Sequence, residues 1–460
     1  MVKNHKNNRV DRRVGGIRPI RVLPLGFAVI ILLGALLLML PIASKNGSTL
    51  SFSEALFTAT SASCVTGLVV VDTGTYFSLF GQVVILIMIQ LGGLGFMTMA
   101  TILFSLTGRK ISLHDRMTMA EGLGENHLQG IVRLCRSVLL VTFVCESLGA
   151  LLLAVRFIPQ FGPAKGVWYG IFHSVSAFCN AGFDLIGGYR SFTEYTADAY
   201  VQFVLMALII LGGLGFSVIL NVKRKKRFGS LRLHSKLVLV GTACLIVLGT
   251  LLILIVEYDN PQTIGNMPFW EKALNSMFQS VTLRTAGFNT IDQFAMRDAT
   301  KGVGIILMLV GGAPAGTAGG LKVTTIATLF LAMRAYVRGR FDTVAFGRTI
   351  PLEQVRRAMT VFFFGILFVL GMTIAMSVIE QNRAGGTFGM WNQLYETVSA
   401  FCTVGVSCGV TAAVTRASRV ILILMMYVGR VGLLTLAMSL TDGGVTESLM
   451  HYPQEDVLIG

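Results

Sequence analysis

The chain carries little charge for its length. Of its 460 residues, 13% are charged and 53% are hydrophobic, whereas a soluble globular chain carries about 25% charge. Most of its surface is therefore expected to face lipid. The sequence also lacks a His/Glu metal motif, a Gly-x-Ser-x-Gly motif and an aspartate pair in its apolar segments, which disfavours an enzyme that acts within the membrane.

The cysteines and glycines offer no metal or nucleotide motif. The seven cysteines show no Cys-x-x-Cys spacing and have no histidine cluster near them, so neither a zinc site nor a disulfide framework is indicated. No Walker motif is present, and no dinucleotide-binding glycine fingerprint with its acidic partner. We expect no cofactor in this chain, so any control by nucleotides has to come from another chain.

Positive charge is present but confined to particular places. The net charge is +15, and most of the lysines and arginines fall in four segments. These are residues 1–21, 109–136, 223–236 and 334–357. They flank apolar stretches, which is the pattern of cytoplasmic loops in membrane proteins. A nucleic-acid-binding tail would not recur between membrane spans, so we expect no nucleic-acid partner, while anionic membrane lipid would attract these loops.

One short pattern occurs four times, a little over a hundred residues apart. In each copy a Ser/Thr-rich run ends just before a glycine, and the four glycines are Gly67, Gly182, Gly287 and Gly405. Ser51 and Glu54 have the spacing of a capping box, so a helix is expected to begin there and run to about Ser63. Such a helix rises about 18 Å and is too short to cross a bilayer. It is expected to be a re-entrant half-helix, and the chain a fourfold repeat.

The predicted unit is a span, a half-helix, a loop and a second span. The half-helices that follow the first are expected at residues 168–178, 269–283 and 391–401. The spans are expected at residues 22–40, 80–106, 137–155, 200–222, 237–256, 302–333, 358–379 and 420–440. The fold class is thus an all-α integral membrane protein, with eight spans and four re-entrant loops around a pseudo-fourfold pore. An even number of spans leaves both termini on the cytoplasmic side of a multi-pass protein of the cell membrane.

The repeats also divide the chain into predicted segments. A cytoplasmic arm (1–21) precedes repeat 1 (22–108), and a basic loop and repeat 2 follow (109–222). Repeat 3 with its interrupted last helix (223–335), repeat 4 (336–440) and a C-terminal tail (441–460) complete the chain.

The four loops are candidates for an ion filter. They have mostly apolar or hydroxyl side chains and no carboxylate ring, so their backbone carbonyls would have to replace an ion's hydration shell. That suits a monovalent cation better than calcium or magnesium. The candidate residues are Val65, Thr66, Gly67, Leu68, Asn180, Ala181, Gly182, Phe183, Thr285, Ala286, Gly287, Phe288, Thr403, Val404, Gly405 and Val406.

The long apolar stretch from Gly302 to Met333 contains a glycine-rich insert. As one helix this stretch would be about 48 Å long, against a bilayer core of about 30 Å. Pro314 and the glycines make an unbroken helix improbable. The insert, a gate candidate, consists of Gly311, Gly312, Ala313, Pro314, Ala315, Gly316, Thr317, Ala318, Gly319 and Gly320.

Arg430 is a second gate candidate. It lies inside the last apolar stretch, where a charge is costly and usually faces a cavity or a partner. It stands where Gly93, Gly213 and Gly312 stand in the other repeats. Its guanidinium would oppose a passing cation and could hydrogen-bond the insert's carbonyls. The competing interpretation is a structural pair with a buried acid such as Glu146.

The repeated loop, with Thr403-Val404-Gly405 as its fullest copy, resembles the filter of the Trk/Ktr/HKT superfamily of potassium transporters. The resemblance covers about residues 20–440 and is closest to the Ktr-type membrane subunit of bacteria. It implies potassium uptake across the cell membrane, with sodium as an alternative co-ion or activator, and a gate formed by the insert and Arg430. It also implies a homodimer on a cytosolic ring of KtrA-like regulatory subunits that bind nucleotides.

A sodium-coupled secondary carrier of cations or small solutes is the alternative function. Carriers usually have two repeats and buried acidic residues at the substrate site, whereas this chain has four repeats and few buried acids. The sequence leaves open whether transport is channel-like or coupled to sodium.

Overall fold

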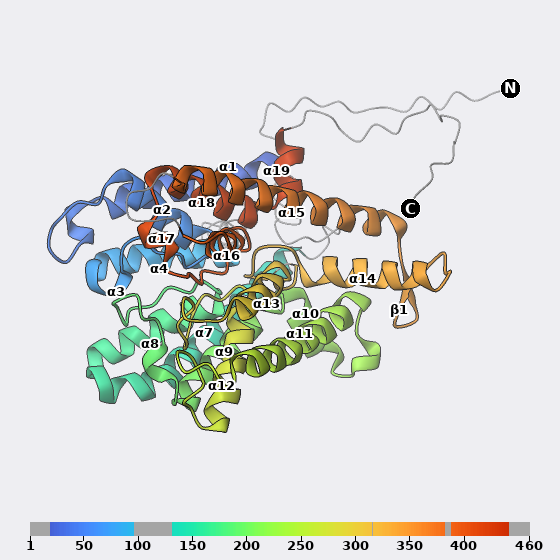
Figure 1. Ribbon diagram of the computed structural model, residues 1–460, viewed down its shortest axis with the longest axis horizontal. Coiled ribbons are helices and arrows are strands. Elements are labelled where there is room, and N and C mark those ends of the chain that lie inside the picture. The colour runs from blue at the N-terminus through green and yellow to red at the C-terminus, as the bar shows by residue number, and fades with distance from the viewer. Residues whose placement is uncertain (1–18, 96–130, 315, 382–387, 441–460) are drawn as a thin grey trace.

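The computed structural model describes residues 19–95, 131–314, 316–381 and 388–440. Most of the expected arm, much of the first basic loop, Ala315 and the C-terminal tail lie outside these residues. The described chain is mostly helical (Figure 1), as expected for an all-α protein. One exception is a hairpin of two short antiparallel strands, β1 (Thr343–Ala345) and β2 (Arg348–Ile350).

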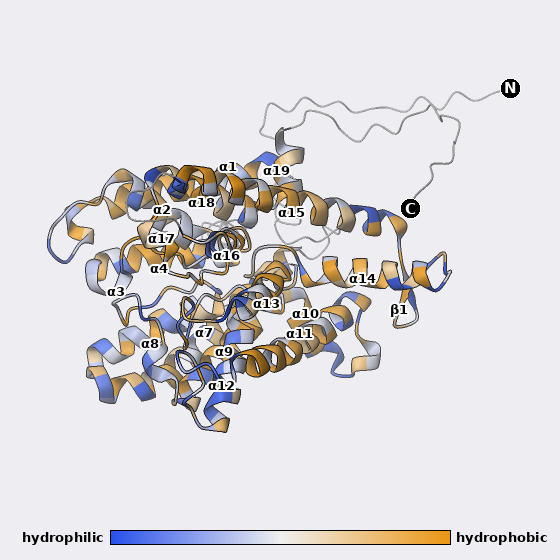
Figure 2. Ribbon diagram, viewed as in Figure 1, coloured by the Kyte–Doolittle hydropathy of each residue, from blue (hydrophilic) through white to orange (hydrophobic). Residues whose placement is uncertain are grey.

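Within the described ranges, four helices are long and apolar enough to cross a membrane, and each lies where a first span of a repeat was predicted. They are α1 (Pro19–Leu38), α7 (Ile131–Phe161), α11 (Leu233–Glu257) and α15 (Leu352–Glu380). Large apolar side chains cover their outer faces: Phe143 is 70% exposed and Ile255 is also 70% exposed. Figure 2 shows that hydrophobic residues predominate along α11 and α15. Such faces suit contact with lipid.

Four shorter helices lie where the half-helices were expected. They are α2 (Phe52–Ser63), α8 (Pro163–Phe178), α12 (Phe269–Thr282) and α16 (Met390–Phe401). The predicted capping box at the start of α2 is confirmed, with Ser51 and Glu54 each bonding the other's backbone. All four helices end directly before a glycine loop. Only α8 differs from its predicted bounds by more than two residues, because Pro163 provides an earlier first turn.

The half-helices supply much of the buried core. Each places one large aromatic side chain nine or ten residues before its loop glycine, and each of these rings is fully buried. They are Phe57, Phe172, Phe278 and Tyr395. The half-helices therefore pack by their own aromatic residues, which positions the loops that follow them.

Two predicted spans are not continuous helices. The span expected at 200–222 is α9 (Ala199–Gly213) and α10 (Phe216–Lys225), which are bent by 95°. The span expected at 420–440 is α18 (Arg416–Val431) and α19 (Leu433–Leu440). Both breaks occur at a glycine with positive φ, Gly215 at 83° and Gly432 at 93°. These backbone angles suit glycine and end a right-handed helix.

The other two second helices also stop early. Helix α4 (Leu79–Leu94) ends at Gly95, which has φ of 77°; the rest of the span predicted at 80–106 lies outside the described residues. In the third repeat, α13 (Asp298–Leu309) and α14 (Val323–Val337) are separated by a non-helical segment. The prediction that the glycine-rich insert interrupts the apolar stretch is therefore confirmed.

The loops lie between two groups of helices. In Figure 1, α1, α2, α15 and α18 lie on one side of the molecule, and α8, α9, α11 and α12 lie on the other. Short elements complete the described chain: η1 (Pro41–Ala43), α3 (Thr73–Tyr76), η2 (Thr193–Tyr195), η3 (Phe228–Ser230) and α17 (Val410–Ala413).

Candidate functional site

The four glycine loops meet in a closed ring. The glycine of each loop lies against the backbone of the next loop. If this glycine carried a Cβ, the atom would press against the carbonyl oxygen of the residue that precedes the next loop's glycine. The pairs are Gly67 with Ala181 at 2.5 Å, Gly182 with Ala286 at 2.8 Å, Gly287 with Val404 at 2.6 Å, and Gly405 with Thr66. The ring follows chain order and closes from the fourth loop to the first. Because the backbones approach this closely, only glycine fits at these four positions.

The loops share one unusual backbone conformation. The residue two before each glycine has positive φ although it carries a side chain: Val65 at 58°, Asn180 at 58°, Thr285 at 74° and Thr403 at 52°. The four glycines also have positive φ, between 68° and 94°. The residue directly before each glycine does not. This alternation is the kind of backbone that can turn successive carbonyl groups toward one side, as a carbonyl filter requires.

The loop carbonyls lack partners within the described protein. Among the residues that the structure describes, no donor bonds the backbone oxygens of 65–67, 180–182, 285–287 or 403–405. Buried carbonyls are nearly always paired, so unpaired ones gathered in a ring are available to a ligand. They are oxygen donors, and oxygen donors suit a hard cation.

Hydroxyl groups of the half-helices hold the loops in place. Ser61 Oγ accepts a hydrogen bond of 3.1 Å from the Gly67 N–H, and Ser399 Oγ accepts one of 3.1 Å from the Gly405 N–H. In the other two loops the hydroxyl donates to the carbonyl after the glycine: Ser176 to Phe183 at 2.7 Å and Thr282 to Phe288 at 2.5 Å. The Ser/Thr-rich ends of the half-helices thus fix the loop backbone.

A cavity of about 440 Å³ lies on one side of the ring and is lined by all four glycines. Asp184 and Asp292 also line it. Partial burial raises the pKa of Asp184 to about 6, and nearby Asp72 adds to the rise, while backbone N–H groups of Gly187 and Ile186 lower it. Above that pH the Asp184 carboxylate adds negative charge to the cavity.

Asp72 has a structural role. Its carboxylate caps α3 by accepting from the Thr75 N–H at 2.8 Å, and it accepts from the Tyr189 N–H at 2.7 Å. It does not line the cavity. Within the described ranges no cluster of His, Cys, Asp and Glu side chains could hold a metal ion, so carbonyl oxygens are the donors that the ring itself offers.

Sequence reasoning missed Glu396, which is fully buried in α16. Its carboxylate accepts from Ser407 Oγ at 2.8 Å, from the Cys408 N–H at 3.3 Å and from the Thr411 N–H at 3.1 Å. It thereby holds the chain that leaves the fourth loop. The signal was available, because a carboxylate within a buried apolar helix needs partners and usually has a specific role.

The glycine-rich insert runs directly behind the loops. The Ala313 N–H donates to the Gly213 carbonyl at 2.9 Å, and Thr317 Oγ1 donates to the Phe178 carbonyl at 3.2 Å. A Cβ on Gly320 would lie 3.0 Å from the Cα of Cys402. Contacts with α8, α9 and the fourth loop therefore hold the insert beside the ring, and its glycines permit the close approach.

Arg430 bonds the insert from the opposite wall. Its guanidinium donates to the carbonyls of Thr317 and Gly92, and to that of Gly93 at 3.2 Å. The two gate candidates thus lie together, as expected. The proposed pairing with Glu146 is not what the structure has, because the Glu146 carboxylate accepts from Gln90 Nε2 at 3.1 Å.

Known proteins resemble this chain over nearly its whole length. The TrkH family model, described as cation transport protein, matches residues 27–442. Ktr system potassium uptake protein B of Bacillus subtilis (strain 168) is 40% identical over 442 residues, which cover 96% of this chain and 97% of that protein. Potassium/sodium uptake protein NtpJ of Enterococcus hirae is 40% identical over 453 residues, covering 98% and 99%.

A solved structure agrees in fold. The potassium transporter TrkH from Vibrio parahaemolyticus superposes with a TM-score of 0.73 at 16% sequence identity, covering 96% of this chain and 87% of the other. The superfamily inferred from the loop residues is therefore confirmed: this chain belongs to the TrkH family of cation transport proteins.

Proposed function

We propose that this protein takes up potassium across the cell membrane through the ring of four loops. One observation carries the proposal: unpaired carbonyls of all four loops meet at glycines that line a single cavity. A ring of backbone oxygens can replace the hydration shell of a monovalent cation. Two relatives that are 40% identical bear names of potassium uptake proteins, which favours potassium as the ion.

The proposed topology has eight spans. Each long helix, α1, α7, α11 and α15, is the first span of a repeat, and the interrupted helices after the loops are the second spans. By length and composition alone, four helices qualify, or five if the bent pair α9 and α10 counts as one. A second span broken where it lines the pore is tolerated, because its irregular backbone need not face lipid. Both termini then lie in the cytoplasm.

The insert and Arg430 form the proposed gate. Arg430 joins an insert carbonyl to the carbonyls of Gly92 and Gly93, so its positive charge lies in the path below the ring. A cation that leaves the ring meets electrostatic repulsion until these bonds break. Lys322 strengthens this barrier: its Nζ donates to the Ala318 carbonyl at 2.7 Å, within the insert.

Sodium is the second candidate ion. Thr-Val-Gly is present only in the fourth loop, and one relative is named for potassium and sodium uptake. A sodium-coupled mechanism is kept as the alternative to a channel-like pore. Three relatives are named as parts of Ktr systems, which supports an assembly with further components of such a system. We propose that this assembly is a homodimer bound to a cytosolic ring that binds nucleotides.

Uptake of radioactive rubidium into proteoliposomes that contain this chain alone tests the proposal. Potassium should displace rubidium strongly, sodium weakly and lithium not at all. Uptake that is absent, and stays absent after a cytosolic regulatory ring is added, would reject the potassium pore.

A further inference from the structure

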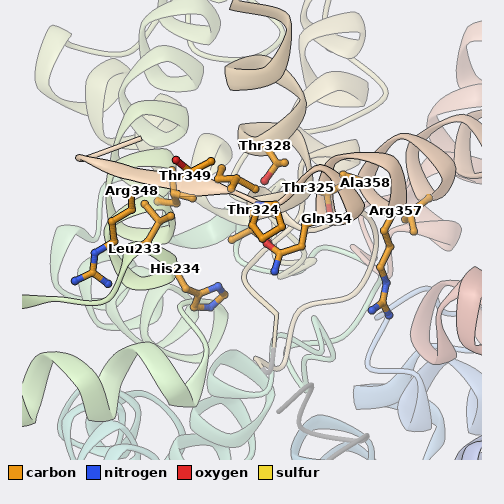
Figure 3. Close-up of a pocket in the computed structure, with 14 residues that line it drawn as sticks. Leu233, His234, Thr324, Thr325, Thr328, Arg348, Thr349, Gln354, Arg357 and Ala358 are labelled. Atoms are coloured by element: carbon orange, nitrogen blue, oxygen red, sulfur yellow. The ribbon is translucent and has the colours of Figure 1, made fainter. Parts of the chain in front are cut away.

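A second cavity, of about 510 Å³, shares no lining residue with the cavity at the glycine loops and is rich in hydrogen-bond donors (Figure 3). It is formed by α11, α14, β2 and the start of α15. Its polar lining residues are His234, Thr324, Thr325, Thr328, Arg348, Thr349, Gln354 and Arg357. Among the residues that the structure describes, none that lines it is acidic. A cavity with two arginines and no carboxylate favours an anion.

The arginines are available to a ligand. Arg348 and Arg357 are both exposed and have no ion-pair partner among the residues that the structure describes. Figure 3 shows them on opposite sides of the cavity, with His234 and Gln354 between them. The nearby Glu353 does not line the cavity, so no carboxylate of the lining competes for their charge.

A threonine hydroxyl also faces the cavity without a partner in the described protein. Thr328 is only 9% exposed, and within the described part of the chain its hydroxyl makes no hydrogen bond. Figure 3 shows this hydroxyl turned into the space between the labelled side chains. A ligand oxygen at this point could accept a hydrogen bond from it.

Three helices contribute their first turns to the wall. Leu233 and His234 belong to the first turn of α11, Thr324 to that of α14 and Gln354 to that of α15. None of the three helices has a side-chain cap at its N-terminus. First-turn N–H groups without intrahelical partners carry partial positive charge, which adds to that of the arginines.

We propose that this cavity binds the phosphate group of an anionic molecule, and that the molecule is a membrane phospholipid. Phosphate matches the planar donors of arginine and the uncapped helix ends. The lipid source follows from the apolar part of the lining, which includes Leu237, Ile350 and Val361, and from Phe330 and Met333 of α14, which are 59% and 60% exposed. Basic pockets between membrane helices are suited to such headgroups.

The test compares two double variants of equal charge. R348Q/R357Q removes both arginines of the cavity, and the control R340Q/R356Q removes two exposed arginines that do not line it. Purified full-length protein in detergent is titrated with phosphatidylglycerol, with phosphatidylcholine or with inorganic phosphate, while the melting temperature is recorded. A bound anion raises this temperature because it stabilises only the folded protein.

We expect phosphatidylglycerol to raise the melting temperature of wild type and control alike. For the same rise in melting temperature, R348Q/R357Q should need a lipid concentration at least about tenfold higher than wild type, because charged hydrogen bonds to the phosphate are lost. The same pattern with inorganic phosphate would support the anion site and assign a soluble phosphate in place of lipid. Equal responses of the two double variants, or phosphatidylcholine acting as well as phosphatidylglycerol, would overturn the proposal.

Discussion

The ring of loops and the level of the chain directly behind it are built differently. In the ring, four copies share one backbone conformation, one glycine position and one closing contact. Behind the ring the four repeats differ: glycines stand at residues 92–93 and 212–213, the insert begins at Gly311, and Arg430 stands in the fourth repeat. An ion held by carbonyls needs near-equal distances on all sides, whereas a gate needs an element with two arrangements. The comparison therefore separates selectivity from gating.

A Cβ at one ring glycine is the sharpest way to break the ring. In Gly405→Ser the added Cβ would press on the Thr66 carbonyl, and the φ of 94° is strained for serine. Strain of this kind costs about 1–3 kcal/mol, so the preference for potassium over sodium should fall about tenfold or more. Competition of potassium and sodium with rubidium uptake measures it.

Gly347→Ser is the matched control. Gly347 also has positive φ, 73°, but has open space around its Cβ position. It should keep the preference of the wild type. An equal loss in both variants would mean that serine disturbs folding in general and that the ring is not the filter.

Changes behind the ring should have the opposite effect. They should raise cation flux and leave the preference for potassium over sodium nearly unchanged. Arg430→Ala removes the bonds to Thr317 and Gly92, and deletion of residues 311–320 removes the insert itself. Arg430→Ala should raise rubidium uptake several-fold, because a positive charge inside a span is a large local barrier. The deletion should also raise uptake, because it removes the segment that lies beside the ring and bonds Arg430. Arg416→Ala, at the exposed start of the same helix, serves as control. Unchanged uptake by the deletion variant across potassium concentrations would contradict the gate.

Removing a hydroxyl that holds a loop should lower the preference for potassium less than replacing a ring glycine does. Ser399→Ala removes the acceptor of the Gly405 N–H, and such a bond contributes about 1 kcal/mol. We expect the preference for potassium over sodium to fall a few-fold. Ser137→Ala makes the same chemical change on α7, where the hydroxyl bonds only its own helix, and should have no effect. If Ser399→Ala lost as much preference for potassium as Gly405→Ser, the hydrogen bond from the Gly405 N–H, and not the glycine itself, would fix the loop.

Neutralising Asp184, in the cavity beside the ring, should have the smallest effect on uptake. With a pKa raised to about 6, Asp184 is charged at pH 7.5 and neutral at pH 5, so attraction of cations should weaken as the outer pH falls. One charge is worth about 1 kcal/mol at 4 Å in water. Uptake at low rubidium should drop a few-fold between these pH values, less so at high salt. Asp184→Asn should flatten this change, and a variant that keeps the full pH response would exclude Asp184 as its source.

The sequence predicted the half-helices and their loops well because their signals are local. A capping box starts α2, and Ser/Thr-rich runs end all four half-helices before a glycine. The interruption of the third repeat was predicted from Pro314 and its glycines. These features act over a few residues, so they can be found without knowing the fold.

The breaks in the other second helices were missed, although a signal existed. Gly-Gly-Leu-Gly-Phe occurs at residues 92–96 and again at 212–216, and its last glycine is where α4 ends and α9 bends. Long apolar stretches masked it, since an isolated glycine is tolerated in a helix. The bond from Arg430 to an insert carbonyl was predicted, but its bonds to the carbonyls of Gly92 and Gly93 were not, because repeats 1 and 4 meet there only in the folded chain.

The most direct test of the ring is to locate the ion itself. Crystals grown in rubidium or thallium salts would give an anomalous signal from any bound cation. The account predicts a peak enclosed by the four loops, within coordination distance of the carbonyls of Thr66, Ala181, Ala286 and Val404. A ring without a peak, beside a strong peak elsewhere in the protein, would contradict it.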